Sequence, residues 1–397
     1  MADLPLSGLR VLDCATFIAA PFSAAILSEF GAEVIKVEQP DGGDALRKFG
    51  TPTARGDSLA WLTEARNKTS ITLDLRQAEG KELFRSLVAK SDVVCENFRP
   101  GTLEKWGLGW ENLCEVNPGL IMLRVSGYGQ TGPKRDLPGF ARIAHAFGGL
   151  TYLAGMPGGP PVTPGSTSLA DYISGLFGAI GILIALRHRE RTGEGQYIDL
   201  ALYEAIFRVL DEIAPAYAMF GKVREREGSG TLNACPHGHF ACGDDHWVAI
   251  ACTSDKMFQR LAQVMARPDL AERFPKTADR LKHRGIVDGE VAAWTGRMPR
   301  AQVIALCDQG EVPCGPVNSI AEIFADPQFA ARENLLRLTD KLLGEVVVPN
   351  VLPRLSASPG RVDHLGPELG SGNQAVYGGL LGLGADELAR LRAKRII

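Results

Sequence analysis

Residues 10–38 read RVLDCATFIAAPFSAAILSEFGAEVIKVE, and this stretch decides the fold class. Its two ends, RVLDC and EVIKVE, are short runs rich in Val, Ile and Leu, which is typical of strands. The segment between them, FSAAILSEFGA, has the apolar spacing of a helix. A strand, a helix and a second strand in this order predict a βαβ unit with two parallel strands.

The same alternation continues through the first half of the chain. Further strand-like runs are SITLDL (70–75), DVVCENF (92–98) and LIMLRVSGYG (120–129), and residues 78–92 have the spacing of an amphipathic helix. We therefore predict an α/β fold with a mainly parallel sheet. In such sheets ligands bind outside the carboxyl ends of the strands, so the loops to inspect follow Cys14, Glu38, Leu75 and Phe98.

A second region begins near Arg224, where charged residues and glycines become frequent. It contains the strand-like HWVAIAC and helical segments up to about Arg332, and the tail adds a strand-like LGEVVVPN and an amphipathic ADELARLRAKRII. We expect a large domain over 1–223, to which 333–397 return, and a smaller α+β domain over 224–332.

Composition and charge exclude several classes of protein. The 397 residues are 45% hydrophobic and 22% charged, and the net charge of −3 does not indicate a nucleic acid or a membrane surface as partner. The start lacks the basic and apolar regions of a signal peptide, and the longest apolar run, Tyr172–Leu186, is shorter than the roughly 18 residues of a membrane span. Eight scattered cysteines favour a reducing compartment. We expect a cytoplasmic enzyme.

The stretch STSLADYISGLFGAIGI (166–182) contains a single charged residue, Asp171. Prolines and a glycine precede it, and Ser166, Thr167 and Ser168 supply hydroxyls of the kind that cap helices. Asp171 is therefore expected near a helix N-terminus, where the helix dipole stabilises negative charge. The alternative is a covalent nucleophile, because a carboxylate attacks efficiently when water is kept away from it.

Two other motifs are weaker. GYGQTG (127–132) has the glycine spacing of a dinucleotide site, but loop residues follow it, and no acid lies between Asp136 and Asp171. CPHGHFACGDDHW (235–247) combines two Cys and three His, yet its spacing matches no common zinc site. We expect a structural or ligand-facing loop there and no bound metal.

ENFRPGTLEKWG (96–107) follows a predicted strand and places Arg99 and Lys105 beside a Pro-Gly turn. Two cations at the carboxyl end of a strand suit a phosphate-bearing ligand, because a guanidinium can donate two parallel hydrogen bonds to one phosphate group. The alternative is an ordinary solvated basic turn.

Several stretches together resemble the class III CoA transferases, the family of the formyl-CoA and carnitine CoA transferases. The matching segments follow the order of the family and extend from Leu6 to Asn334: LSGLRVLDCATFIAAPFSAAILSEFGAEVIKVEQPDGGD, RNKTSITLDL, VVCENFRPGTLEKWGL, VSGYGQTGP, SLADYISG, ERTGEGQYIDLAL and VPCGPVNSIAEIFADPQFAAREN. The resemblance implies a Rossmann-like large domain, a small domain and two interlocked chains in a homodimer.

The resemblance also implies roles for individual residues. Asp171 occupies the position of the family's nucleophile, which would form mixed-anhydride and aspartyl-CoA thioester intermediates. The positions implied for binding CoA, a substrate and not a permanently bound cofactor, are Phe17, Ala19, Leu73, Asn97, Phe98, Arg99 and Lys105.

Positions at which this sequence differs from related enzymes narrow the range of expected substrates. Ile18 and Phe140-Ala141 replace the Gln and Tyr-Glu of formyl-CoA members, which makes oxalate and formyl-CoA poor expectations. Arg142 adds a cation that would pair with a second substrate carboxylate, or would lie on the surface. We expect succinyl-CoA as donor and a short dicarboxylic acid, such as mesaconate, itaconate, citramalate or malate, as acceptor.

Two alternatives remain. One is an α-methylacyl-CoA racemase of the same fold, although Phe140 stands where those enzymes carry a basic His, and His145 is expected to be packed or hydrogen-bonded. The other is a thioester hydrolase or a CoA-binding protein without turnover.

Overall fold

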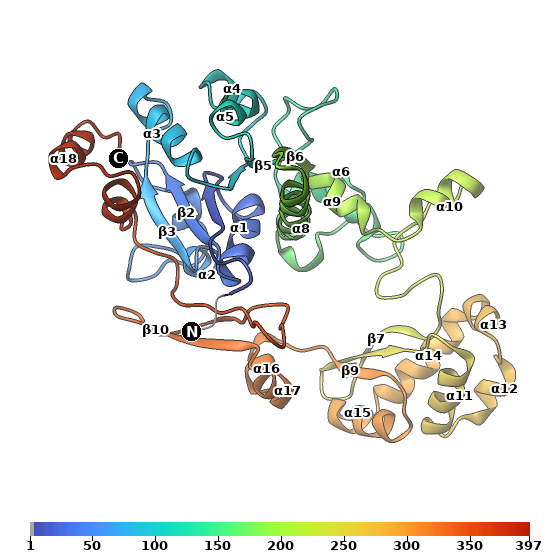
Figure 1. Cartoon of the computed structure of the whole chain (residues 1–397). Coiled ribbons are helices and arrows are strands. Elements are labelled where there is room, and N and C mark those ends of the chain that lie inside the picture. Colours follow the sequence, from blue (N-terminus) through green and yellow to red (C-terminus); the bar gives the residue numbers. More distant parts are fainter. Residues whose placement is uncertain (1–3) are drawn as a thin grey trace. The chain divides into compact units, whose positions relative to one another are not determined.

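The computed structural model describes residues 4–397 and divides into two compact units (Figure 1). The first unit comprises 4–150, 165–212 and 333–397, and the second comprises 151–164 and 213–332. The sequence-based boundary at 224 differs from this division. Residues 213–220 form a helix, α10, none of whose residues is buried, and they group with the second unit.

The first unit contains a six-stranded sheet in the order β3-β2-β1-β4-β5-β6, in which every neighbouring pair is parallel. This confirms the predicted α/β fold with a parallel sheet. The sixth strand, which pattern analysis did not single out, pairs with β5. The strands are β1 (Arg10–Asp13), β2 (Glu33–Glu38), β3 (Lys68–Thr72), β4 (Val93–Glu96), β5 (Ile121–Ser126) and β6 (Gln196–Ala201).

Helices connect these strands. Helix α1 packs against α8, and α8 also packs against β5 and β6. The division between the two units falls inside α7, after its first residue. The helical elements of the first half are α1 (Ala19–Glu29), η1 (Ala45–Lys48), α2 (Leu59–Glu64), α3 (Ala78–Val88), α4 (Thr102–Lys105), α5 (Trp110–Val116), α6 (Ala141–Phe147), α7 (Leu150–Leu153), η2 (Pro164–Ser166), α8 (Leu169–Thr192) and α9 (Leu202–Arg208).

The C-terminal segment, residues 333–397, groups with the first unit. Val376, Tyr377 and Leu388 are buried in the same apolar cluster as Phe84 of α3. The Tyr377 hydroxyl also donates to the Thr72 carbonyl at 2.8 Å, which ties the tail to the end of β3. The elements here are β10 (Leu335–Asp340), β11 (Gly344–Pro349), the π-helix η3 (Gln374–Leu380) and α18 (Ala385–Ala393).

The second unit has its own apolar core, formed by residues such as Val248, Phe258 and Val303. Its three strands form an antiparallel sheet in the order β7-β8-β9. Its elements are α10 (Ile213–Phe220), β7 (His237–Ala241), β8 (Trp247–Ala251), α11 (Asp255–Val264), α12 (Pro268–Arg273), α13 (Thr277–Lys282), α14 (Arg284–Thr295), α15 (Arg300–Gln309), β9 (Cys314–Pro316), α16 (Ile320–Ala325) and α17 (Pro327–Ala331).

Helix α8 is long and apolar enough to cross a membrane by length and composition alone, although its uninterrupted apolar run is shorter. Of its most apolar window, 44% is buried inside the single chain. The buried side includes Ser174, Gly178 and Ile182, whereas Ile180 and Ile184 are more than half exposed. Helix α8 is therefore a core helix on one side and an apolar surface on the other.

Candidate active site

A pocket of about 200 Å³ lies in the first unit at the carboxyl ends of β1, β4 and β5. Strands β1 and β4 are neighbours at the point where the strand order reverses, which is where open α/β sheets bind ligands. The lining residues are Thr16, Phe17, Ile18, Ala19, Asn97, Phe98, Arg99, Pro100, Val125, Ser126, Gly127, Leu137, Pro138, Gly139, Phe140, Asp171 and Leu202.

Asp171 is in the first turn of α8 and is partly buried in this pocket. Burial raises the pKa of its carboxyl group to about 7. Within residues 4–397, no group hydrogen-bonds or ion-pairs with the carboxylate. A desolvated carboxylate without a cation beside it is costly for the fold, and such groups are common at sites of chemistry.

The start of α8 is stabilised differently from the sequence-based expectation. The side chain of the N-cap residue Ser168 makes no capping hydrogen bond. The Ala170 N–H instead donates to Nε2 of His145 at 2.9 Å. His145 is only 1% exposed, so the expectation that it is packed and hydrogen-bonded is confirmed. Its contact with the helix of Asp171 joins residues far apart in the sequence, and no local signal indicates it.

Helices α1 and α8 approach each other closely near the pocket. Gly175 of α8 faces the Ala19 carbonyl of α1, and the Ser23 hydroxyl donates to the Gly175 carbonyl at 2.8 Å. One residue after Asp171, the Tyr172 hydroxyl donates to Glu64 Oε1 at 2.9 Å. These contacts fix the position of Asp171 relative to the amino end of α1.

That end of α1 borders the pocket, where the N–H groups of Ala19 and Ala20 are the first of the helix. The first N–H groups of a helix have no partner within it, and the N-cap residue Ile18 offers no side-chain acceptor. Ile18 and Ala19 line the pocket together with Asp171. The N–H groups and the positive end of the helix dipole are suited to stabilise an oxyanion that forms beside the carboxylate.

The loop that leads into α1 is held by the side chains of Asn97, which is half-buried, and Asp44, which is buried. Asn97 accepts a hydrogen bond from the Thr16 N–H at 2.8 Å and donates one to the Thr16 carbonyl at 2.7 Å. Asp44 accepts from the Phe17 N–H at 3.0 Å, and Phe17 has a left-handed backbone with φ of 61°. Since the Asn97 amide is occupied by Thr16, it shapes the pocket wall from within the protein.

A buried ion pair supports the loop after β4, and sequence reasoning missed it. Glu96 Oε2 accepts from the Phe98 N–H at 2.8 Å, and Glu96 Oε1 lies 2.8 Å from Arg124 Nε. Burial raises the pKa of Glu96 to about 7, with Arg124 acting in the opposite direction. Glu96 and Arg124 are on adjacent parallel strands, but strand pairing cannot be read from either run alone.

The structure brings most of the predicted site residues together. Eight of them line one pocket around Asp171: Phe17, Ile18, Ala19, Asn97, Phe98, Arg99, Phe140 and Asp171 itself. Three do not. Leu73 lines a neighbouring cavity of about 40 Å³, which shares Thr16 and Phe98 with the main pocket. Lys105, at the end of α4, and Arg142, in α6, are exposed and outside the lining.

The two weaker motifs have other structural roles. Residues 127–139 form a loop without a helix, so the helix that a dinucleotide site requires is missing there. Residues 237–241, expected as a loop, form strand β7, which pairs with β8 as a hairpin. Among residues 4–397, no group of three or more His, Cys, Asp or Glu side chains is arranged to hold a metal ion.

The sequence matches the family model described as CoA-transferase family III over residues 6–373. It is also similar to the succinyl-CoA–L-malate CoA-transferase of Chloroflexus aurantiacus. The alpha subunit of that enzyme is 60% identical, covering 100% of this chain and 93% of the relative, and the beta subunit is 58% identical, covering 99% and 98%.

Two further relatives extend the comparison. The succinyl-CoA–D-citramalate CoA-transferase of Chloroflexus aurantiacus is 45% identical over 99% of this chain and 98% of its own length. The crystal structure of a CAIB/BAIF family protein from Brucella suis is 34% identical. It superimposes with a TM-score of 0.85 and covers 96% of this chain and 100% of that chain.

Proposed function

The chain is a CoA-transferase that belongs to CoA-transferase family III, and from this premise we propose that it transfers CoA from succinyl-CoA to a short dicarboxylic acid of the malate or citramalate type. The observation that carries the proposal is the unpaired carboxylate of Asp171 in the pocket at the switch point of the sheet. The names of the relatives support the choice of donor and acceptor.

In the first half of the reaction, an Asp171 carboxylate oxygen attacks the thioester carbon of succinyl-CoA. The carbon–sulfur bond breaks, CoA leaves as the thiolate, and a mixed anhydride of succinate and Asp171 remains. The thiolate then attacks the Asp171 acyl carbon, which releases succinate and leaves an aspartyl-CoA thioester. The amino end of α1 would stabilise the oxyanion that each attack creates.

In the second half, a carboxylate of the acceptor attacks the aspartyl-CoA thioester and releases the thiolate again. The thiolate attacks the acceptor carbonyl of the new anhydride, which forms the product thioester and regenerates the Asp171 carboxylate. Water would hydrolyse both intermediates, so the site must exclude it while they exist. The apolar lining around Asp171, including Ile18, Phe140 and Leu202, suits that requirement.

We further propose that Arg142 attracts the second carboxylate of the acceptor. Its charge acts on His145, which contacts the first turn of α8, so a cation lies near the site although outside the pocket lining. Arg142→Ala is expected to raise the KM for the dicarboxylic acceptor and leave the KM for succinyl-CoA unchanged. An unchanged acceptor KM would remove Arg142 from the proposal.

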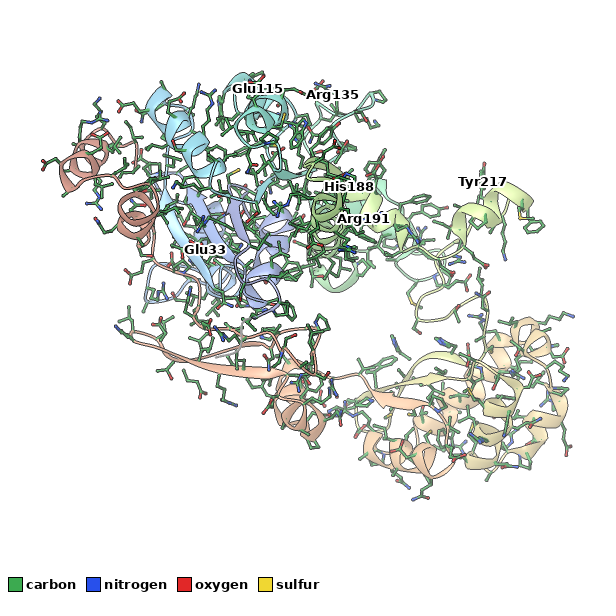
Figure 2. All side chains as sticks on the ribbon, in the orientation of Figure 1. Glu33, Glu115, Arg135, His188, Arg191 and Tyr217 are labelled. Carbon is green, nitrogen blue, oxygen red and sulfur yellow. The ribbon has the colours of Figure 1, made fainter. Side chains whose placement is uncertain are left out.

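The assembly we propose is a homodimer, interlocked as the family resemblance implies, in the cytoplasm. Leu176, Ile180 and Ile184 form an exposed apolar stripe along α8, between 49% and 65% exposed. In the second unit, α10 exposes Tyr217, which is labelled in Figure 2, and also Met219 and Phe220. Large exposed apolar surfaces of this kind mark interfaces between proteins. The alpha and beta subunits named for the Chloroflexus relatives make a pair of unlike chains a further possible outcome.

The test is an incubation of the purified protein with succinyl-CoA and one acid at a time: L-malate, D-citramalate, mesaconate, itaconate or glutarate. Mass spectrometry follows new CoA thioesters, and Asp171→Asn is the matched control. Transfer to one acid, lost in the variant, supports the proposal. Hydrolysis without transfer would favour a thioesterase, and deuterium exchange at the α-carbon of a 2-methylacyl-CoA would favour a racemase.

A further inference from the structure

The first turn of α8 depends on an acceptor from another helix. The Asp171 N–H donates to the Ser168 carbonyl, but the Ala170 N–H has no acceptor in the residues just before it. Since the Ser168 side chain makes no capping hydrogen bond, the acceptor for Ala170 is Nε2 of His145 in α6, at 2.9 Å. An imidazole therefore replaces the usual capping hydroxyl, one residue before Asp171.

This hydrogen bond determines the protonation state of His145. Nε2 can accept only through its lone pair, so the imidazole is neutral and its proton is on Nδ1. Nδ1 is buried and has no hydrogen-bond partner among residues 4–397. Burial first, and the charge of Arg142 second, lower the pKa of His145, which favours the same neutral form.

We propose that His145 is a positioning residue, which orients the first turn of α8 and thereby the Asp171 carboxylate by capping the Ala170 N–H. The proposal rests on Asp171 being the nucleophile of the proposed function. It assigns His145 no proton transfer with the substrate, because its lone pair is committed to the helix and the residue lies outside the pocket lining. The substrate would meet Asp171, and Asp171 would depend on His145.

The experiment compares His145→Gln, whose side-chain carbonyl can accept from the Ala170 N–H, with His145→Leu, which cannot accept. Ser168→Ala is the matched control. The same substitution at an ordinary N-cap removes a capping hydrogen bond, but the Ser168 side chain makes none. Hydrogen–deuterium exchange at the Ala170 amide reports the cap itself, and kcat and KM report its effect on transfer from succinyl-CoA.

We expect His145→Leu to accelerate exchange at Ala170 and to lower kcat roughly tenfold, which corresponds to about 1.4 kcal/mol in the activation free energy. The KM for succinyl-CoA should stay unchanged. His145→Gln should restore both the protection and kcat, and Ser168→Ala should resemble the parent chain in both. If His145→Leu does not fold, His145→Ala, which is smaller and also lacks an acceptor, takes its place in the comparison.

Two results would overturn the proposal. One is His145→Gln with a protected Ala170 amide but a kcat as low as that of His145→Leu, which would make the imidazole a participant in the chemistry. The other is unchanged hydrogen–deuterium exchange at the Ala170 amide in His145→Leu, or accelerated exchange at that amide in Ser168→Ala. Absence of CoA transfer by the parent chain would contradict the proposed function, while the exchange measurement would still test the cap.

Discussion

Gly175 of α8 and Ala19 of α1 approach so closely that a Cβ atom at position 175 would lie 2.8 Å from the Ala19 carbonyl oxygen. The same atom would lie 2.8 Å from Cδ1 of Phe22. Since backbone cannot retreat as a side chain does, only glycine allows the two helices to pack at this separation. The approach matters because α1 brings its N–H groups, and α8 brings Asp171, to the same pocket.

Gly175→Ala is therefore expected to separate the amino ends of α1 and α8. We expect a loss of about 2 kcal/mol in the free energy of unfolding from overpacking. A decrease in kcat should accompany it, because the proposed oxyanion donors at the start of α1 and the proposed nucleophile, Asp171, would move apart. Urea denaturation and the succinyl-CoA transfer assay measure the two effects.

The matched control for this variant is Gly181→Ala on the same helix. A Cβ atom there would lie 3.4 Å from the nearest atom, Cγ2 of Ile198, and the helix backbone favours Ala over Gly by about 1 kcal/mol. This variant should be as stable as the parent or slightly more stable. Equal effects of the two substitutions would mean that the α1–α8 approach is not specific to position 175.

Asp171 makes both activity and stability depend on pH. Its pKa is raised to about 7, so the carboxylate that we propose as the nucleophile becomes protonated as the pH falls below 7, and kcat/KM for succinyl-CoA should decrease on that side. The free energy of unfolding changes in the opposite direction: it decreases as the pH rises. The raised pKa means that ionisation in the folded state costs free energy as the pH rises from about 4, the pKa in the unfolded chain, to about 7.

Asp171→Asn should remove both effects. Because Asp171 is only partly buried, we expect the variant to be more stable by about 2 kcal/mol above pH 7, and equal to the parent below about pH 4. Its transfer activity should be absent at every pH. Thermal unfolding at pH 4 and pH 8 measures the difference, and a variant that is less stable than the parent at pH 8 would mean that Asp171 is a stabilising helix cap.

The parallel sheet and the position of the pocket were predictable because both depend on local patterns. Alternating apolar runs mark β1 to β5, and the ligand site of such a sheet follows from its topology. The family resemblance led to Asp171, whose isolation in an apolar stretch is visible in the sequence. The contacts that hold the site, such as His145 with Ala170 and Glu96 with Arg124, join separate elements and leave no local trace.

Some predictions failed for the same reason. Residues 237–241 have glycine and polar residues typical of a loop, but their pairing with β8 makes them a strand. Ser168 has the residue type and position of an N-cap, yet the imidazole of His145 takes that role from a distance. In both cases a tertiary contact outweighs a correct local preference.

The ion pair between Glu96 and Arg124 supports the loop that carries Asn97, Phe98 and Arg99. Arg124→Met would leave the buried Glu96 carboxylate without its cation, which typically costs about 3 kcal/mol. Without Arg124, the pKa of Glu96 would rise beyond about 7, so the loss should be large at pH 8 and smaller at pH 6, where Glu96 takes up a proton.

The double variant Arg124→Met with Glu96→Gln separates charge from packing. It removes the buried charge, while the Gln carbonyl can still accept from the Phe98 N–H. Most of the lost stability should return, and the pH dependence should disappear. A double variant as unstable as Arg124→Met alone at pH 8 would show that the packing of the Arg124 side chain, and not the unpaired carboxylate, is what the fold loses.

The exposed apolar stripe on α8 leads to a prediction about assembly. Ile180 is 51% and Ile184 is 65% exposed, and residues four apart lie on the same side of a helix. In a homodimer this stripe would be covered, so Ile180→Glu with Ile184→Lys would bury two charges at the interface. The dimer should then dissociate, and light scattering should give the mass of a monomer.

Gly285→Glu is the control, because a Cβ atom there meets nothing within 4 Å. If the parent chain is already a monomer in solution, or if the variant stays a dimer, this stripe is not the dimer interface. Binding of the parent chain to lipid vesicles, lost in the variant, would assign the stripe to a membrane surface instead.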